Sequence, residues 1–485
     1  MTMHVVFVGC ALPKLSRLME HVSAECGVRV SHIVTTGGDV DVLRREGVPD
    51  SDIHRIEAPQ VLPRPTAHDL EELAALERDG VPTINNMILS DPVVSKLPYD
   101  DGVAYALYVA RGLKALYQRL QPDVVLGGHD RVHSSMGFAV AHAAAIPWFG
   151  MSFSTVPMGH VALTPGIVPG ETMDLRGGPT PGLDTRAEAY LQEFETGRLR
   201  APAYVSAHSA GMVVSRLGQH ARAGLRSLMA LGRGSFNRYN DHALGWQVKR
   251  YVRKRRNLMR LPRKWMLTAP PAEPFVFFGL HMQPEATPDV YAPFFSNQLD
   301  VVEKIARALP PTHLFLVKLH ISDADNYSPA QLRRFLQLPR VRLVLPSVSS
   351  RDFISQCAGV VTICGTMGLE AALLGKPAVL FGKMPYDVFP NVARVTDLYE
   401  LPALLRAQLS APAPSRDQIR GAYAKYLGNF FCAMTPGSSI QLDDWTHVHP
   451  SDDEKRGFVE LFRALQGYLS RRSGAADAAD GSPRG

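Results

Sequence analysis

The chain has 485 residues, of which 46% are hydrophobic and 20% charged, and its formal net charge is +6. This composition is typical of a globular protein, and the length favours two domains with a terminal extension over a single core. No stretch reaches the ~20 apolar residues of a membrane-spanning helix. The five cysteines are scattered without a CxxC pair, which indicates reduced thiols and a cytoplasmic protein.

The first half of the chain alternates apolar runs with segments of helical periodicity. Strands are expected at residues 4–9, 29–36, 53–56, 122–128 and 146–151, and helices at 15–25, 40–46, 103–120, 134–145 and 188–196. Between these segments, residues 59–101 and 164–202 are rich in proline or glycine. The alternation predicts a doubly wound α/β sheet, so we expect residues 1–200 to form an N-terminal Rossmann-like domain.

Four polar side chains follow the strand predicted at residues 122–128. They are His129, Asp130, Arg131 and His133. Open α/β sheets bind their ligands at the carboxyl ends of their strands, so this cluster is a candidate for substrate chemistry. The alternative is that these residues cap the next helix and bond to nearby loops.

A basic segment separates the two halves of the chain. Residues 242–272 contain no acidic residue, and within 249–264 nine lysines and arginines accompany Tyr251, with Trp246 and Trp265 on either side. Such a segment suits an anionic membrane surface or an anionic acceptor, whereas a solvated face on a connector at 201–272 is the alternative. No nucleic-acid-binding module accompanies the charge, so we do not expect a nucleic-acid partner.

A second α/β block begins after the basic segment. Strands are expected at residues 275–280, 314–317, 342–345, 360–363 and 378–381, and helices at 297–308, 351–357, 401–409 and 416–427. We assign residues 273–440 to this C-terminal Rossmann-like domain, followed by a helix within 441–472 (residues 453–472) and a disordered tail at 473–485.

The turn after the strand at 360–363 is the most informative stretch. Gly365 and Gly368 let the backbone approach a ligand closely, Thr366 lies between them, and the following helix start carries unpaired N–H groups that attract phosphate. Glu370, one turn further on, is placed to accept hydrogen bonds from ribose hydroxyls. The alternative is a tight turn with a carboxylate that complements the helix dipole.

Several other chemistries lack their sequence signatures. The chain has no HExxH motif, zinc-ligand set, P-loop or GxSxG elbow, and the first strand is not followed by GxGxxG. Asp323-Ala324-Asp325 is a DxD triplet of the kind that holds a metal in some sugar transferases, but such triplets arise often by chance. We therefore expect neither a metal nor a resident cofactor.

The second block resembles the bacterial capsule polysaccharide biosynthesis family. The resemblance rests on residues 277–285 (Phe-Phe-Gly-Leu-His-Met-Gln-Pro-Glu), Asn297-Gln298-Leu299, Val317-Lys318-Leu319-His320, and residues 362–382 with Tyr386. It covers about residues 275–387, and the first half of the chain shares only the layout. The family consists of GT-B glycosyltransferases, some of which transfer Kdo from CMP-Kdo.

The resemblance implies a donor nucleotide in the second domain and an acceptor in the first, with the reaction in the cleft between two facing Rossmann-type domains. Carried onto this sequence, Lys318 and His320 would face the donor phosphates, and Gly365, Thr366 and Glu370 its phosphate and ribose. The family often has Lys-Glu-His-Pro where this chain has Lys318-Leu319-His320-Ile321. This departure puts CMP in doubt as the nucleotide, while the fold is unaffected.

Sugar transfer needs positive charge or a proton at the leaving phosphate and a base or nucleophile near the anomeric carbon. The candidates for supplying positive charge or a proton are His281, Lys318 and His320. Asp130 is the candidate base or nucleophile, and Glu285 is the alternative to Asp130. His129, Arg131 and His133 are assigned to the acceptor.

The sequence therefore predicts a metal-independent glycosyltransferase that moves a sugar from a nucleotide sugar to a capsule, lipopolysaccharide or other surface glycan, free or lipid-linked. It would act in the cytoplasm, at the inner face of the membrane if the basic segment binds there. The alternatives are a GT-B nucleotide-sugar epimerase, a polymerase that transfers polyol phosphate, and a non-catalytic scaffold of the same pathway.

Overall fold

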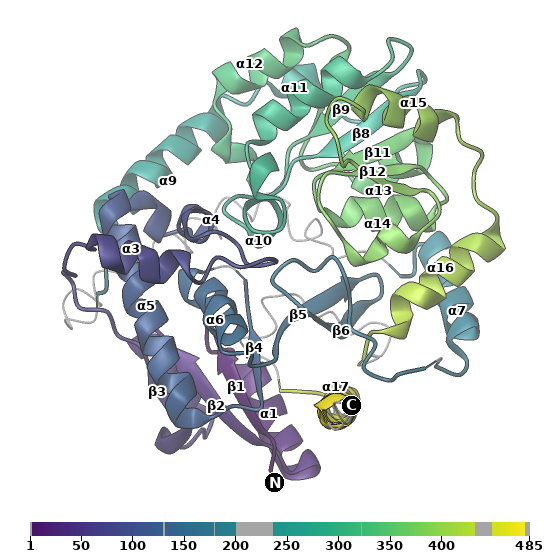
Figure 1. Cartoon of the computed structure of the whole chain (residues 1–485). Coiled ribbons are helices and arrows are strands. Elements are labelled where there is room, and N and C mark those ends of the chain that lie inside the picture. Colours follow the sequence, from purple (N-terminus) through teal and green to yellow (C-terminus); the bar gives the residue numbers. More distant parts are fainter. Residues whose placement is uncertain are drawn as a thin grey trace.

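The computed structural model of the chain divides into two α/β units, each built on a largely parallel sheet (Figure 1). It describes the following residues: 2–129, 131–178, 180–199, 236–321, 323–431 and 449–480. Within this part of the chain the first unit carries a six-stranded sheet and the second a seven-stranded one. The predicted α/β class with two doubly wound units, the architecture of GT-B proteins, is confirmed.

The first sheet has the strand order β3-β2-β1-β4-β5-β6. Its strands are β1 (His4–Val8), β2 (Arg29–Val34), β3 (Ile53–Arg55), β4 (Val124–Gly127), β5 (Trp148–Thr155) and β6 (Met158–Thr164). The helices of this unit are α1 (Pro13–Cys26), α2 (Gly37–Arg45), α3 (Ala67–Ala74), α4 (Ile84–Ser90), α5 (Tyr99–Leu120) and α6 (Val132–Ala143). All five residues of β1 are buried, as expected for a central strand covered by helices on both faces.

The second sheet has the strand order β13-β12-β11-β8-β9-β10-β7, and all its pairings are parallel. Its strands are β7 (Met266–Leu267), β8 (Phe275–Gly279), β9 (Leu314–Lys318), β10 (Val341–Val344), β11 (Gly359–Thr362), β12 (Ala378–Leu380) and β13 (Val392–Arg394). Its helices are α9 (Leu244–Met259), α10 (Ala286–Asp289), α11 (Gln298–Ala308), α12 (Pro329–Gln337), α13 (Ser350–Gln356), α14 (Thr366–Leu373) and α15 (Leu401–Ser410). The carboxyl ends of β9, β8 and β11 are neighbours, so the loops that follow these strands meet.

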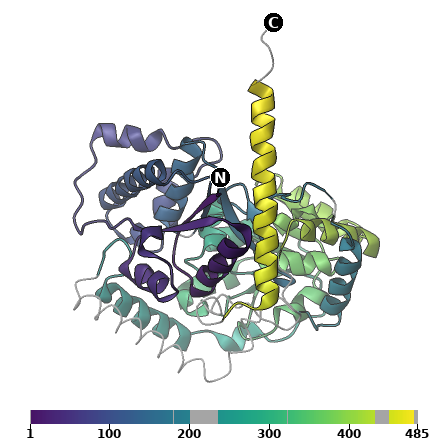
Figure 2. The same cartoon turned by 90° about the horizontal axis from the view of Figure 1, so that it is seen from below.

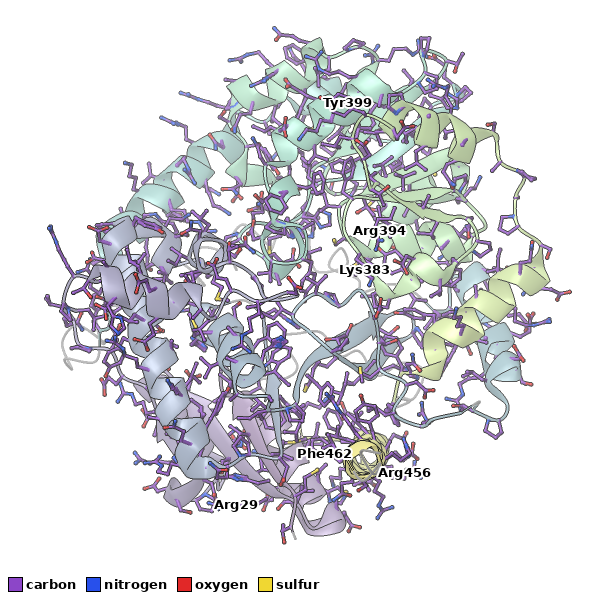
Figure 3. All side chains as sticks on the ribbon, in the orientation of Figure 1. Arg29, Lys383, Arg394, Tyr399, Arg456 and Phe462 are labelled. Atoms are coloured by element: carbon purple, nitrogen blue, oxygen red, sulfur yellow. The ribbon has the colours of Figure 1, made fainter. Side chains whose placement is uncertain are left out.

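Two helices cross from one unit to the other. α7 (Leu183–Glu195) follows the first sheet in sequence but packs on α16 (Arg416–Gly428), where Leu191 and Phe194 share a buried cluster with Tyr423. In the other direction, α17 (Asp452–Asp480) returns to α1 and buries Phe462 against the first unit. Figure 3 shows Phe462 and Arg456 on opposite sides of α17. The boundary predicted at residue 200 thus follows a helix that packs with the second unit.

Three segments differ from the sequence prediction. The strand expected at 146–151 continues to Thr155 and turns back as β6, which pairs antiparallel with it. β7 lies inside the predicted connector 201–272 but pairs with β10 in the second sheet. The tail expected to be disordered from residue 473 instead continues α17 to Asp480, and the helix projects beyond the body of the molecule in Figure 2.

Composition explains the longer helix. Residues 475–480 include four alanines, and alanine has the highest helix propensity of the common residues. Residues 201–235 of the predicted connector and 481–485 of the predicted tail lie outside the described part of the chain. In that described part, no helix combines the length and the apolar character needed to cross a bilayer.

Candidate active site

The turn between β11 and α14 has the predicted strand-turn-helix form. Gly365 is the N-cap residue of α14 and has an extended backbone, and its N–H donates to the Thr362 hydroxyl at 3.0 Å. A Cβ atom at Gly365 would lie 2.6 Å from Thr362 Oγ1 and 3.0 Å from His281 Cε1. At Gly368 a Cβ atom would lie 2.8 Å from the Tyr386 hydroxyl. Side chains of this protein therefore fill the space beside both glycines.

This packing bears on the predicted phosphate site. The close neighbours of Gly365 and Gly368 explain why larger residues are disfavoured there, which supports the tight-turn alternative for the two glycines. The N-terminus of α14, which begins at Thr366, remains the place where backbone N–H groups and the helix dipole favour an anion.

Lys318 and Glu370 are two opposite charges buried close to each other behind this turn. Lys318 ends β9 and Glu370 lies in α14, with exposed fractions of 6% and 8%. Burial raises the pKa of Glu370 to about 7, against the opposing charges of Arg351 and Lys318. Burial likewise lowers the pKa of Lys318 to about 8, against the charge of Glu370.

Neither of these two charged groups forms a hydrogen bond with another residue in the described part of the chain. Buried ionised groups are normally hydrogen-bonded as well as paired, because desolvation of each charge is costly. A carboxylate and an ammonium with pKa values near neutrality and free hydrogen-bonding capacity are typical of a binding or catalytic site.

His281 follows β8, the strand that lies between β9 and β11 in the sheet. Gln298 holds its backbone from both sides: the His281 N–H donates to Gln298 Oε1 at 2.6 Å, and its carbonyl accepts from Gln298 Nε2 at 3.0 Å. Burial, together with the charge of His320, lowers the pKa of His281 to about 3. The imidazole is therefore neutral at physiological pH. The role predicted for His281 was to supply positive charge or a proton; the neutral ring carries no charge but can still donate or accept a hydrogen bond.

His320 and Glu285 lie around the same loop. His320 is half-buried and close enough to His281 to affect its pKa. Glu285 is half-buried at the N-cap of α10, and its N–H donates to Asp289 Oδ2 at 3.1 Å. The Ser90 hydroxyl of the first unit donates to the Asp289 carbonyl at 2.5 Å. Glu285 therefore stands where the two units touch.

The predicted acceptor residues of the first unit have unequal environments. The ring of His129 packs edge-on against Tyr291 of the second unit, with ring centroids 5.3 Å apart. Arg131 instead lies 3.3 Å from Asp91 Oδ2 in an ion pair. His133 is 3% exposed inside α6, and burial lowers its pKa to about 3, helped by the charge of Arg131. Asp130 lies outside the described residues.

Of the three acceptor candidates that can be placed, His129 is the one that reaches the other unit. Arg131 and His133 serve the interior of the first unit, because Asp91 pairs with Arg131 and accepts N–H groups from Val93, Val94 and Val132 at the β4–α6 turn, and His133 is buried. The acceptor role predicted for Arg131 and His133 finds no support in this arrangement.

The DxD triplet binds an amine of the same chain. Lys254 Nζ of α9 lies 2.9 Å from Asp323 Oδ1 and 3.3 Å from Asp325 Oδ1. Asp323 also accepts the Gln283 N–H at 3.2 Å and the Asn326 side-chain amide at 3.1 Å. No cluster of three or more His, Cys, Asp or Glu residues suited to a metal occurs in the described ranges. The triplet is therefore a structural anchor for α9.

Sequence reasoning missed Asp91, Gln298 and Arg351 as residues that organise the site. Gln298 lies in one of the segments that carry the family resemblance, so that segment could have indicated a role for it in the site. Asp91 lies in the proline-rich stretch 59–101, where no periodicity marked it. The guanidinium of Arg351, whose charge opposes the raised pKa of Glu370, donates to the Glu195 carbonyl at 3.3 Å, a contact between α13 and α7 that no local pattern indicates.

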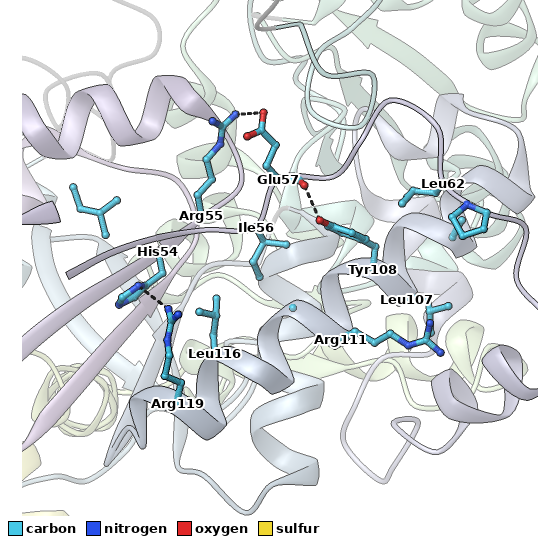
Figure 4. A pocket seen from close by; sticks show the side chains of 14 residues that line it. His54, Arg55, Ile56, Glu57, Leu62, Leu107, Tyr108, Arg111, Leu116 and Arg119 are labelled. Atoms are coloured by element: carbon cyan, nitrogen blue, oxygen red, sulfur yellow. Dashed lines mark hydrogen bonds and ion pairs between the residues drawn. The ribbon is translucent and has the colours of Figure 1, made fainter. Parts of the chain in front are cut away.

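A cavity of about 560 Å³ lies elsewhere, between β3 and α5 at the outer edge of the first sheet (Figure 4). Its polar groups bind one another: Arg119 Nη2 lies 3.2 Å from His54 Nδ1, and the Tyr108 hydroxyl donates to the Glu57 carbonyl at 2.8 Å. None of the predicted site residues lines this cavity. Its position and its internally paired polar groups set it apart from the candidate active site.

Comparison with known proteins confirms the family resemblance for one segment. Residues 291–399 match the family model described as "Capsule polysaccharide biosynthesis protein". This segment contains Lys318, His320, Gly365, Thr366, Gly368 and Glu370. Protein FixF of Sinorhizobium fredii is 25% identical over 159 residues, which cover 32% of this chain and 38% of that protein. The chain therefore matches well under half the length of this curated relative.

Solved structures give distant similarities. The β-Kdo 2,4 transferase KpsC of Thermosulfurimonas dismutans has a TM-score of 0.37 and 13% identity, and covers 70% of this chain and 87% of its own. The UDP-GlcNAc 2-epimerase of Methanocaldococcus jannaschii in complex with UDP-GlcNAc and UDP has a TM-score of 0.30 and 10% identity, with coverages of 88% and 98%. MnaA of S. aureus with UDP has a TM-score of 0.29 and 11% identity, with coverages of 88% and 91%.

Proposed function

We propose that this protein is a glycosyltransferase that takes a sugar from a nucleotide-activated donor and builds a capsule, lipopolysaccharide or other cell-surface glycan. The observation that carries the proposal is the buried pair Lys318–Glu370, at the end of β9 and in α14, which forms no hydrogen bond in the described part of the chain and lies inside the segment that matches the family model. An ordinary structural ion pair would be hydrogen-bonded in that environment.

In this proposal the donor-binding residues have separate tasks. The N-terminus of α14 at Thr366 and the ammonium of Lys318 supply positive charge to the donor phosphate, while the Glu370 carboxylate accepts hydrogen bonds from two adjacent ribose hydroxyls. Ligand hydroxyls would replace the hydrogen bonds that the buried carboxylate lacks, and a phosphate would do the same for Lys318. Nucleotide binding therefore removes the cost of two poorly solvated charges.

In the chemical step, the bond between the anomeric carbon and the phosphate oxygen breaks and a bond from the acceptor hydroxyl to that carbon forms. Charge that develops on the leaving phosphate is stabilised by Lys318, with His320 as a second group that can carry a proton. The acceptor proton passes to a carboxylate of the first unit or of the interface, and the candidates are Asp130 and Glu285. The neutral imidazole of His281 positions the turn through its contact with Thr362, where Nε2 and Oγ1 are 3.4 Å apart.

The finer parts of the predicted function remain proposals. CMP-Kdo and other nucleotide sugars are the donor candidates, and a free or lipid-linked glycan is the acceptor. We retain action in the cytoplasm, in contact with the inner face of the membrane, as part of the proposal. The membrane contact has a structural basis of its own in α9.

Thermal unfolding with CMP, CDP, UDP and GDP tests the donor site. A nucleotide that binds only the folded protein at ~100 times its dissociation constant adds about 2.7 kcal/mol of stability, which is a readable shift. We expect one nucleotide to raise the melting temperature of the wild type and of Glu20→Gln, an exposed control on α1. The same nucleotide should leave Glu370→Gln unchanged relative to its own ligand-free value.

Product analysis then distinguishes sugar transfer from the epimerase and scaffold alternatives. Incubation of the stabilising nucleotide's sugar derivatives with a surface-glycan acceptor should release nucleotide only when the acceptor is present. Conversion of the nucleotide sugar without acceptor would replace the proposal with an epimerase. If no nucleotide stabilises the wild type and no transfer occurs, the scaffold alternative takes its place.

A further inference from the structure

Helix α9 is attached to the protein along one face. Lys254 is 8% exposed and binds Asp323 and Asp325, and Asn257, three residues later and 2% exposed, donates to the Asp325 carbonyl at 3.1 Å. Residues three and four apart share one face of a helix, so these two contacts define the inward side of α9.

The outward side of α9 carries an apolar stripe. Val248, Val252 and Met259 are exposed by 53%, 58% and 72% of their surface. Their spacings of four and seven residues place them on one line along the helix, opposite Lys254 and Asn257. Trp265, which is 52% exposed, extends the apolar surface just beyond the end of the helix. Isolated exposed apolar residues are common, but a line of them on one helix face marks a binding surface.

Basic side chains flank this stripe. Residues 242–272 contain nine lysines and arginines and no acidic residue. Lys249, Arg253, Arg256 and Arg260 are exposed, and none of them forms an ion pair within the described part of the chain. The charge is therefore available to an external partner. We name the exposed face formed by Val248, Lys249, Val252, Arg253, Arg256, Met259, Arg260 and Trp265 the α9 face.

We propose that the α9 face docks on an anionic lipid bilayer. A bilayer interface accepts both parts of this surface at once, because the valines, Met259 and Trp265 enter the boundary between headgroups and acyl chains while the arginines and lysines meet lipid phosphates. A nucleic acid would satisfy the charge but gain little from the apolar stripe. The combination of chemistries is what favours the membrane.

Because of the position of α9, docking would also place the candidate active site relative to the membrane. α9 lies along the outer edge of the molecule, on the side where the two units adjoin (Figures 1 and 2). Its anchor Asp323 also accepts the N–H of Gln283, two residues after His281. Docking would thus hold the loop 281–285 beside the bilayer, within reach of a lipid-linked acceptor. This consequence, unlike the docking itself, rests on the proposed function.

Vesicle co-sedimentation without nucleotide tests the docking independently of catalysis. Vesicles of phosphatidylcholine containing phosphatidylglycerol should bind the full-length wild type, and vesicles of phosphatidylcholine alone should not. We expect Arg253→Glu/Arg256→Glu to weaken binding at least about tenfold, because each basic residue near the surface contributes to attraction, and added salt to weaken wild-type binding. The matched charge control is Arg45→Glu/Arg406→Glu, two exposed arginines on α2 and α15, which should bind as the wild type does.

A second variant separates a membrane from a general polyanion. Val248→Ser/Val252→Ser keeps every charge and should weaken vesicle binding about tenfold, since the two side chains lose most of their apolar surface. The melting temperatures of all variants should match the wild type because the substituted side chains are exposed. Equal vesicle binding by the wild type and either α9 variant would overturn the proposal. Tighter binding of a single-stranded RNA oligomer than of the vesicles, unaffected by the serine substitutions, would replace the membrane with nucleic acid.

Discussion

The carboxyl edges of the two sheets are built from the same kind of elements but treat buried charge in opposite ways. In the first unit, Arg131 and Asp91 form an ion pair, and Asp91 also accepts three backbone N–H groups. In the second unit, Lys318 and Glu370 are just as buried but form no hydrogen bond in the described part of the chain. The difference teaches that a buried charge held by an ion pair and several hydrogen bonds belongs to the fold, whereas a buried charge without such contacts marks a candidate binding site.

The loop 281–291 joins these two edges. Ala286 of α10 and Val290, which follows this helix, pack into the core of the first unit, and Tyr291 contacts His129. The same loop begins at His281, beside the turn of α14. Residues that were predicted from separate halves of the sequence are therefore connected through one short segment. If the edge of the first sheet around Asp91 serves structure and the edge of the second sheet around Glu370 serves binding, substitutions at the two edges should have opposite effects on stability.

The largest effect on stability is expected at the edge of the first sheet. Asp91→Ala removes the partner of the mostly buried Arg131 and leaves three N–H groups without an acceptor, so we expect the free energy of unfolding to fall by about 3–5 kcal/mol. Chemical denaturation measures the loss, with the exposed Asp79→Ala as control. A loss below about 1 kcal/mol would contradict the structural role of this edge.

A substitution at the edge of the second sheet should raise stability instead of lowering it. Burial raises the pKa of Glu370 to about 7 from its usual 4.5. The folded protein therefore binds this proton more tightly than the unfolded chain, and ionised Glu370 lowers stability above pH 7. We expect Glu370→Gln to gain roughly 1–3 kcal/mol near pH 9, where Lys318 is largely neutral too.

The pH dependence sharpens the same test. The gain from Glu370→Gln should shrink as the pH falls from about 7 toward 4.5, because the wild type then becomes protonated in both the folded and the unfolded state. Unfolding curves across this range, with Glu20→Gln beside the variant, measure the change. A variant that is less stable than the wild type at about pH 9 would show that Glu370 holds the fold together.

A double-mutant cycle measures how strongly the two charges depend on each other. Between pH 7 and 8, where burial leaves Glu370 mainly ionised and Lys318 mainly charged because their pKa values are about 7 and 8, we expect Lys318→Met and Glu370→Gln to couple by about 0.5–3 kcal/mol. Lys318→Met alone should weaken binding of the stabilising nucleotide by roughly 10–100-fold, since it removes a charge-assisted contact to phosphate. Additive stability changes would mean that the two groups act independently.

The smallest effect is expected where the two edges meet. Ser90→Ala removes the hydrogen bond from the first unit to the Asp289 carbonyl, and we expect the free energy of unfolding to fall by about 1 kcal/mol. Ser95→Ala is the matched control because the Ser95 hydroxyl has no hydrogen-bond partner among the described residues. Equal effects of the two substitutions would show that the Ser90 contact does not hold the loop.

Local patterns in the sequence were sufficient to predict most elements of both sheets and the turn from residue 363 to 368. Apolar residues with periods of two or 3.6, together with glycine and proline at segment ends, depend only on neighbours along the chain. The same is true of the strand ends, so Lys318, His281 and Glu370 could be gathered into one candidate site once their strands were predicted to be parallel. The second strand of the β5–β6 hairpin was missed, since no prediction was made for residues 152–163.

The sequence by itself determined the α/β alternation, the strand ends and the residue types available at each end. Tertiary structure alone decided that α7 packs on the second unit, that α17 returns to the first, that Lys254 occupies the DxD triplet and that Arg131 belongs to Asp91. These outcomes depend on pairs of residues far apart in the chain, whose burial and hydrogen bonding no local pattern encodes. The state of each charge followed from the same cause, because burial and the nearest opposite charge exist only after folding.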